Sequence, residues 1–249
     1  MRRWILRVLV VLALLFAGLL AGGRALSKPL PVGESGAAAE QLADTMLAAI
    51  DAEGWARTGA IRWTMASHKH LWDRTRSLAR VRWGRYEALV VLADGTGRAF
   101  KDGVPLEGRA ARKAVEKGYS YWVNDAFWLA APTKVRDDGT SRQLVSTPSG
   151  DALLVSYSSG GLTPGDAYLW HLDSAGLPTA WSLWVSIVPI KGARFSWEGW
   201  QTLETGAKVS TLHRVEGRLN YEFYLTDVAG AEQLGALEPG PDPFQALNP

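Results

Sequence analysis

The sequence predicts a mainly β protein of the α+β class, in which a large curved antiparallel sheet forms a half-open barrel and helices plug its concave face. About ten segments show the two-residue period of strands, and most are separated by Gly, Pro, Asp or Ser. A twisted sheet of about ten strands has to curl, close or split. Two helical segments, one before the sheet and one inserted into it, are available to fill the concavity.

The first helix follows a linker at residues 26–34 that contains Pro29 and Pro31. Ser35 is placed to cap it, and the helix should end near Gly54. Its apolar residues form one stripe at helical spacing: Ala39, Leu42, Ala43, Met46, Leu47 and Ile50.

From Ile61 onward the period changes from helical spacing to two. Ile61, Trp63 and Met65 alternate with polar neighbours, and an apolar run at 88–93 ends at the turn dipeptide Asp94-Gly95. Helical patterns interrupt the strands at 109–117, ending at Gly118, and at 123–130, ending at Pro132. The later predicted strands are 133–136, 143–146, 153–157, 167–172, 180–188, 195–203, 208–214 and 219–227.

The amino-terminal segment predicts export from the cytoplasm. Arg2, Arg3 and Arg7 accompany an apolar run from Val8 to Leu20, and small residues follow it. Residues 1–25 are therefore expected to be a secretory signal peptide, with an uncleaved inner-membrane anchor as the alternative. We expect the domain at 35–237 to lie in a bacterial periplasm, and the proline-rich tail at 238–249 to lie on the surface or to be disordered.

Composition excludes several classes of function. The chain of 249 residues has no Cys, which removes disulfides, thiolate metal sites, a cysteine nucleophile and a lipid-modified cysteine. The net charge of +2 comes from the signal, because residues 1–25 hold four Arg and no carboxylate. Without them Lys plus Arg falls from 27 to 23 against 25 Asp plus Glu, so we expect no nucleic-acid partner.

His68 and His70 are the one pair of residues with metal-ligand spacing. On a strand both face the same side, and Asp73, His171 or His213 could add a third ligand only through tertiary structure. Two ligands are not a site, so the sequence predicts no metal. It also lacks a Gly-x-Ser-x-Gly elbow, and we expect no catalytic residues, no cofactor and no enzymatic activity.

Four arginines are separated by even numbers of positions, as are residues on one face of a strand: Arg74, Arg76, Arg80 and Arg82. A continuous strand would place them in one row, where Arg80 and Arg82 are candidates to hold a phosphate or carboxylate head group. The alternative is a solvated outer face that discourages edge pairing.

Tryptophan is the unusual component of this sequence, with twelve residues. Side chains alternate between the two faces of a strand, so Trp181 and Trp184 should point to opposite faces, as should Trp197 and Trp200. Both faces of the sheet should therefore carry large apolar groups. A ligand cavity and a large aromatic core both remain open as explanations. The candidate ligand-binding residues are Trp63, Trp83, Trp128, Trp170, Trp184 and Phe127.

Residues 121–139 carry a resemblance to a known family. Their pattern, Asn124-Asp125 followed by Phe127-Trp128-Leu129, Pro132, Lys134, Asp137 and Gly139, is similar to a signature of an uncharacterised family of exported bacterial proteins. That family resembles the lipoprotein-localisation (LolA/LolB-like) superfamily, and the likeness covers roughly residues 60–225. A structural interpretation of the motif makes Asn124 and Asp125 cap or hairpin groups, Pro132 a helix stop and Lys134 an ion-pair partner of Asp137 or Asp138.

The resemblance implies a half-open barrel that holds a lipid or acyl chain during transport across the periplasm. We therefore expect a monomeric carrier whose partner is a lipid or an acylated protein. The alternative is a protein-interaction or sensor module of the cell envelope with the same fold, anchored in the inner membrane if residues 1–25 are retained.

Overall fold

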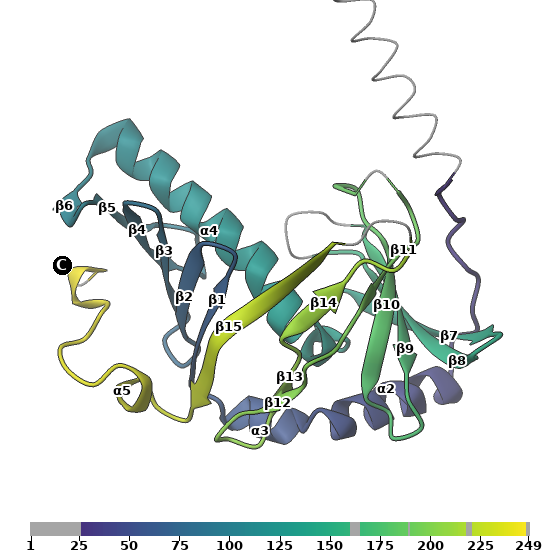
Figure 1. Ribbon diagram of the computed structural model, residues 1–249. Helices are drawn as coiled ribbons and strands as arrows, with labels where there is room; N and C mark the ends of the chain where they lie inside the picture. Colours follow the sequence, from purple (N-terminus) through teal and green to yellow (C-terminus); the bar gives the residue numbers. More distant parts are fainter. Residues whose placement is uncertain (1–25, 160–164, 189, 218–220, 248–249) are drawn as a thin grey trace, which may run out of the picture.

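The computed structural model describes residues 26–159, 165–188, 190–217 and 221–247, and the predicted signal at 1–25 lies outside them. Two antiparallel sheets dominate this part of the chain (Figure 1). The first has the order β14-β15-β1-β2-β3-β4-β5-β6 and the second the order β11-β10-β9-β8-β7. Bridges between Phe195 and Val215 and between Glu198 and Leu212 join β11 to β14, so both sheets form one open, curved surface.

The strands of the first sheet form a chain of hairpins with short connections. They are β1 (Ala60–Met65), β2 (His68–Asp73), β3 (Leu78–Trp83), β4 (Tyr86–Val91), β5 (Gly97–Lys101), β6 (Val104–Pro105), β14 (Leu212–Arg214) and β15 (Glu222–Ala231). The second sheet contains β7 (Thr140–Thr147), β8 (Gly150–Tyr157), β9 (Ala167–Leu172), β10 (Pro178–Trp184) and β11 (Ala193–Ser196). A small ribbon pairs β12 (Gln201–Thr202) with β13 (Lys208–Val209). The predicted large, open antiparallel sheet is confirmed.

One helix, α4 (Gly108–Ala130), runs from the first sheet to the second (Figure 1). Its buried residues Ala114, Gly118 and Asp125 recur at helical spacing and form one stripe. At Gly118 an added Cβ would lie 2.6 Å from the Cβ of Ala88, so a larger side chain would push the helix off the sheet. The 3₁₀ helix η1 (Ala131–Lys134) continues the chain toward β7.

Two further helices, α2 (Ala37–Ala49) and α3 (Ala52–Arg57), lie at the start of the domain. Ala39, Ala43 and Met46 of α2 pack against Trp170 and Trp181 of the second sheet, in the same core as Phe127 and Trp128 of α4. The helices therefore cover one side of the curved sheet, called here the helix face, which confirms the predicted plugging.

Aromatic side chains fill the space between the second sheet and the helices. The ring of Trp181 lies within 5.6 Å of the rings of Phe127, Trp128, Tyr168, Trp170 and Trp197. The indole nitrogens of Trp170, Trp181 and Trp197 are buried and have no hydrogen-bond partner among the described residues. Edge-to-face contacts, such as Trp181 on Trp197 at 81°, are the arrangement in which an N–H can face a ring.

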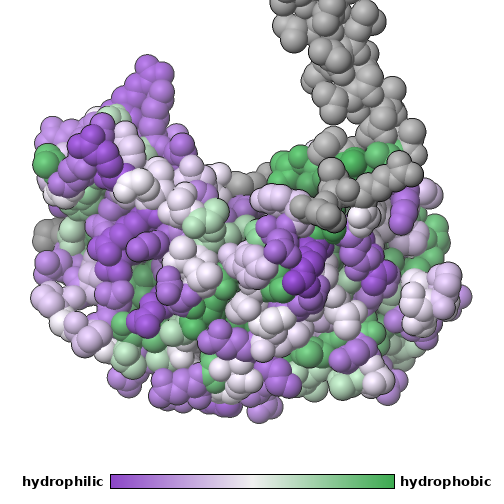
Figure 2. Space-filling model, in the orientation of Figure 1, coloured by the Kyte–Doolittle hydropathy of each residue, from purple (hydrophilic) through white to green (hydrophobic). Residues whose placement is uncertain are grey.

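The two ends of the described chain cover the opposite side, called here the outer face. Residues 26–34 cross the second sheet, where Glu34 forms a bridge with Leu144. The carboxyl-terminal segment, with α5 (Leu234–Leu237) and η2 (Gln245–Leu247), covers the first sheet, and Phe244 is buried there between Leu71 and Leu89. Hydrophilic residues spread over much of the side of the molecule that Figure 2 shows. The predicted tail, as far as residue 247, is thus a packed strap.

Several local predictions were wrong. No side chain caps α2, which follows Gly36, because Ser35 makes no hydrogen bond to it. The two helices predicted at 109–118 and 123–130 are one helix, since Gly118 serves a close contact with the sheet and does not end α4. The strand predicted at 133–136 falls on η1 and the residues after it.

Two long predicted strands are also interrupted. Residues 195–203 divide into β11 and β12, and residues 208–214 into β13 and β14. Gly199 has a φ of +62° and turns the chain, so Trp197 and Trp200 do not alternate on one strand. Both belong to the same core, whereas Trp181 and Trp184 do lie on opposite faces as predicted.

The strap makes a testable contribution to stability. Phe244→Ala should lower the free energy of unfolding by about 3 kcal/mol, because it leaves a cavity between Leu71 and Leu89. Urea unfolding followed by circular dichroism measures this. Val104→Ala, at a side chain with 65% exposure, is the control and should change it by less than about 0.5 kcal/mol. Equally small losses of unfolding free energy in both variants would show that packing of the carboxyl-terminal segment on the sheet does not stabilise the fold.

Candidate functional site

His68, His70 and Asp125 meet on the helix face, between β2 and α4. The Nδ1 atom of His68 and the Nε2 atom of His70 each lie 2.8 Å from the same oxygen, Oδ2 of Asp125. The side chains of His70 and Asp125 are 0% and 2% exposed, whereas that of His68 is 19% exposed. The cluster is therefore buried on one side and reached by solvent at His68.

Each member owes its place to the local structure. His68 and His70 are two apart on β2 and share a face, as the sequence predicted. Asp125 lies in the buried stripe of α4, which brings a carboxylate to that face. The side-chain amide of Asn124 donates to the other oxygen of Asp125, Oδ1, at 2.8 Å. Oδ2 is thereby left to the histidines.

Aromatic rings hold both imidazoles in position. Trp63 stacks on His70 with ring centroids 4.5 Å apart and planes 13° apart. Tyr121 of α4 stacks on His68 at 3.7 Å. The two imidazoles lie nearly perpendicular to each other, at 88°. Rotation of either ring would break a stacking contact, so the cluster is pre-organised.

Burial and hydrogen bonding set the charges in the cluster. Burial alone would raise the pKa of Asp125, but the hydrogen bonds from His70, Asn124 and His68 outweigh it and hold that pKa below its usual value. Burial lowers the pKa of His70, although Asp125 opposes this. Asp125 is thus a buried carboxylate that accepts three hydrogen bonds near neutral pH.

The sequence found two of these three residues and missed the third. Asp73 accepts from Arg76, His171 lies on the outer face of the second sheet, and His213 is buried elsewhere on the helix face. None of the three residues that tertiary structure could have added to the pair joins it. Asn124 and Asp125 are not cap groups, since they lie within α4. A carboxylate inside the aromatic run 121–128 was the available signal, because a buried charge requires a partner.

The structure places most of the candidate tryptophans in the core. Trp63 and Trp170 are 1% and 0% exposed. Trp83 packs against Ala88 and α4, and Trp128 contacts three aromatic rings besides His213, those of Trp181, Phe195 and Phe223. Phe127 stacks on Trp181 at 5.6 Å. Their contact with a ligand stays a prediction.

Arg80 and Arg82 lie on the outer face of the first sheet, and the four predicted arginines do not form one row. A turn at residues 74–77 interrupts the strand, and Arg74 instead lies over the ring of Trp55. Arg80 is paired with Glu238 of the carboxyl-terminal segment at 2.8 Å. Arg82 pairs with Glu87.

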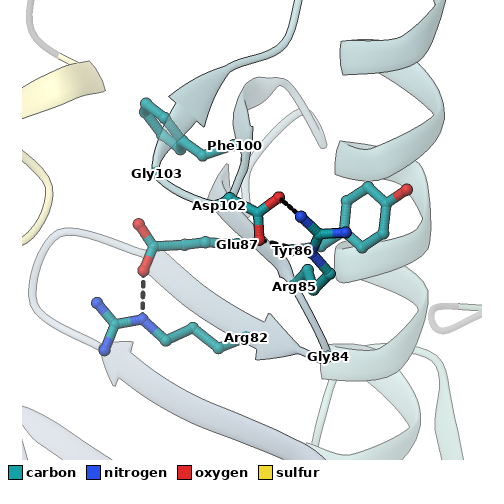
Figure 3. Close-up of a pocket in the computed structure, with 8 residues that line it drawn as sticks. All are labelled: Arg82, Gly84, Arg85, Tyr86, Glu87, Phe100, Asp102 and Gly103. Atoms are coloured by element: carbon teal, nitrogen blue, oxygen red, sulfur yellow. Dashed lines mark hydrogen bonds and ion pairs between the residues drawn. The ribbon is translucent and has the colours of Figure 1, made fainter.

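A hollow of about 480 Å³ contains Arg82 (Figure 3). Arg82 faces Glu87, and Arg85 faces Asp102, so two cations are matched by two carboxylates. Tyr86 and Phe100 complete the walls together with glycines. This balance of charge gives an anionic head group little advantage in the hollow.

A second hollow, of about 330 Å³, lies between residues 26–34 and the outer face of the second sheet. Val145, Leu169 and Trp184 supply apolar surface, and Trp184 donates its indole N–H to the carbonyl of Lys28 at 2.8 Å. The charged lining residues are Lys28 and Arg194, and no carboxylate lines it. Of the six aromatic residues predicted to bind a ligand, Trp184 is the one that lines either of these two hollows.

His171 and Ser182 face each other across two strands in this second hollow. Their side chains are 3.4 Å apart, and no carboxylate is hydrogen-bonded to His171 among the described residues. Burial, and then the charges of Arg194 and Lys28, lower the pKa of His171 to about 4. The pair lacks the third group that orients a catalytic histidine.

Comparisons with known proteins give a likeness to solved structures alone. No protein-family model and no curated protein matches the chain. A DUF1329 family protein from Desulfovibrio piger is 6% identical, with 80% of this chain and 99% of that chain covered and a TM-score of 0.37. A LolA superfamily protein from Nitrosomonas europaea is 13% identical, with 75% and 92% covered and a TM-score of 0.35. Neither name identifies a ligand of this chain.

Among the described residues, no helix has the length and apolar character to span a bilayer.

The buried histidines predict how stability depends on pH. Burial lowers the pKa of His213 to about 4, although backbone hydrogen bonds with Ser196 and Trp128, and the charge of Glu198, oppose it. As the pH falls, the imidazole of His213 gains a proton near pH 6.5 in the unfolded chain but only near pH 4 in the folded chain. The free energy of unfolding should therefore fall as the pH is lowered through this window, by about 2 kcal/mol between pH 7 and pH 5 from His213 alone.

Urea unfolding at several pH values tests this expectation with His213→Gln. The variant should unfold with about one proton fewer taken up in that window, so its stability should depend less on pH. Phe223→Leu, which alters a ring that packs on His213 without changing a titrating group, should keep the original slope. An unchanged slope in His213→Gln would contradict the assignment.

Proposed function

We propose that this chain is an exported cell-envelope protein that binds a lipid through one acyl chain and an anionic head group, in the second hollow. The observation that carries the proposal is the composition of that hollow, where apolar surface and two cationic side chains, but no carboxylate, form the lining. The family resemblance of residues 121–139 and the secretory character of residues 1–25 support the same class of function.

The apolar part of the hollow continues into a cluster on the outer face of the second sheet. Val145, Leu154 and Leu169 are buried there, and the half-buried Trp184 packs against them. Residues 26–34 cover this cluster as an extended segment with two prolines in the wall of the hollow. A volume of about 330 Å³ is at the lower end of ligand pockets, which suits one acyl chain better than two.

The charged part of the hollow favours an anion. Lys28 and Arg194 both lie close enough to His171 to lower its pKa. Arg194 also pairs with Glu216 at 2.9 Å, and Glu216 does not line the hollow. A phosphate or carboxylate bound between these cations would have the opposite effect on His171 and raise its pKa.

The helix face supports lipid binding less directly. Phe127, Trp128 and Trp181 pack against one another there, so an acyl chain could enter only if α4 moved away from the second sheet. Separation of that contact would expose several aromatic rings to water, at a cost of about 25 cal/mol per Å² of apolar surface. The outer-face hollow requires no such opening.

Replacement of Trp184 tests the proposal. Trp184→Ala should weaken binding of a fluorescent fatty acid about tenfold, because it removes the largest apolar wall of the hollow. Displacement titration of the full chain gives the affinity, and native mass spectrometry of the chain purified from a bacterial host shows whether lipid remains bound.

The matched control is Trp200→Ala. Trp200 is also half-buried and donates its indole N–H to a backbone carbonyl, that of Pro178, but it does not line the hollow. It should change the affinity less than twofold. Equal loss of binding in both variants, or no binding of fatty acid or phospholipid by the unaltered chain, would contradict the proposal and favour the protein-interaction module.

A further inference from the structure

We propose that His68, His70 and Asp125 form a binding site for one divalent transition-metal ion, and that Zn²⁺ fits it. This inference is independent of the proposed lipid-binding hollow, because the cluster lies at the first sheet and the hollow lies on the outer face of the second. It rests on the donor set, the convergence of three atoms and the charge of the cluster.

Two imidazole nitrogens and one carboxylate oxygen are the donors that proteins use for Zn²⁺ in sites with an open position. Ca²⁺ and Mg²⁺ prefer oxygen donors and are poorly matched by two imidazoles. In the described part of the chain, these side chains are the one group of three His, Asp or Glu residues whose potential ligand atoms all lie within 4.8 Å of one another.

Binding requires the three donor atoms to move, because they lie within 4.8 Å of one another but not at equal distances. Ligand atoms around tetrahedral Zn²⁺ are about 3.3 Å apart, as follows from bonds of about 2.0 to 2.1 Å. The two N···O distances of 2.8 Å would lengthen by about half an ångström on binding. The movement would fall mainly on His68, whose side chain is 19% exposed, and it would shift that ring against the ring of Tyr121.

The groups around the donors hold them in position, although Nδ1 of His70 is buried with no hydrogen-bond partner among the described residues. Asn124 fixes the carboxylate through Oδ1 and leaves Oδ2 pointing at both imidazoles. Trp63 and Tyr121 fix the ring planes by stacking. Such outer contacts orient metal ligands, and their loss typically weakens metal binding 10- to 100-fold.

The charge of the cluster also favours a cation. The side chain of Asp125 is 2% exposed, and no Lys or Arg pairs with it in the described part of the chain. The two histidines are therefore the only ionisable side chains that contact its carboxylate there. A divalent cation would compensate the buried carboxylate far more completely than neutral imidazoles do. The exposed side of His68 leaves room for a water molecule as the fourth ligand.

Isothermal titration calorimetry of the full chain with Zn²⁺ tests the inference. One ion should bind per chain, and His68→Ala should lower the affinity at least 100-fold with the fold retained, because His68 lies at the exposed edge. Asn124→Ala removes no ligand and should weaken binding about 10- to 100-fold. Circular dichroism of each variant checks that it is folded.

His171→Ala is the control, since His171 is partly buried on the outer face and does not belong to the cluster. It should bind Zn²⁺ as the unaltered chain does. The inference is overturned by the absence of stoichiometric binding, by unchanged binding in His68→Ala, or by an equal loss in His171→Ala. Unchanged affinity in Asn124→Ala would also contradict it.

Discussion

The contact of α4 with both sheets is the constraint on which the rest of the structure depends. The helix has 23 residues, which corresponds to a length of about 35 Å, and it crosses from β5 to the second sheet. Its near half approaches the first sheet closely at Gly118, and its far half inserts Phe127 and Trp128 among the tryptophans of the second. In the described part of the chain the two sheets are joined by isolated bridges beside β11 and β14, and the helix adds a second contact that fixes their relative positions.

The same contact decides what the concave side of the sheet can do. A curved sheet with one helix across it would leave a cavity if the interior side chains were small. Here Trp170, Trp181 and Trp197 occupy that space, and their rings lie about 5 Å from one another. Rings of this size fill the interior to the density of an ordinary core. The hollow in which we propose lipid binding is accordingly on the outer face, under the amino-terminal segment.

The two proposed sites use the covering elements in different ways. At the hollow, an extended segment lies on an apolar strip, and its contacts there include the bond from Trp184 to Lys28 and the bridge at Glu34, so its backbone forms one wall. At the histidine cluster, a helix brings a carboxylate to two residues of a strand 55 and 57 positions away in sequence. The first site depends on shape and net charge, whereas the second depends on the directions of three side chains.

Local patterns determined much of this protein. Alternation identified β1, β3 and β9, the stripe from Ala39 to Ile50 identified α2, and the ion pair of Lys134 with Asp137 followed from the motif. The facing of His68 and His70 to one side was also local, because it follows from the two-residue period. Tertiary structure decided the rest. By local pattern alone Gly118 marks the end of a helix, but in the folded protein α4 continues through it because the neighbouring strand lies too close for a side chain. The carboxylate partner of the two histidines lies on α4, which is brought near β2 only by tertiary packing. Sequence spacing carries no information on such contacts, since they depend on where α4 crosses the sheet.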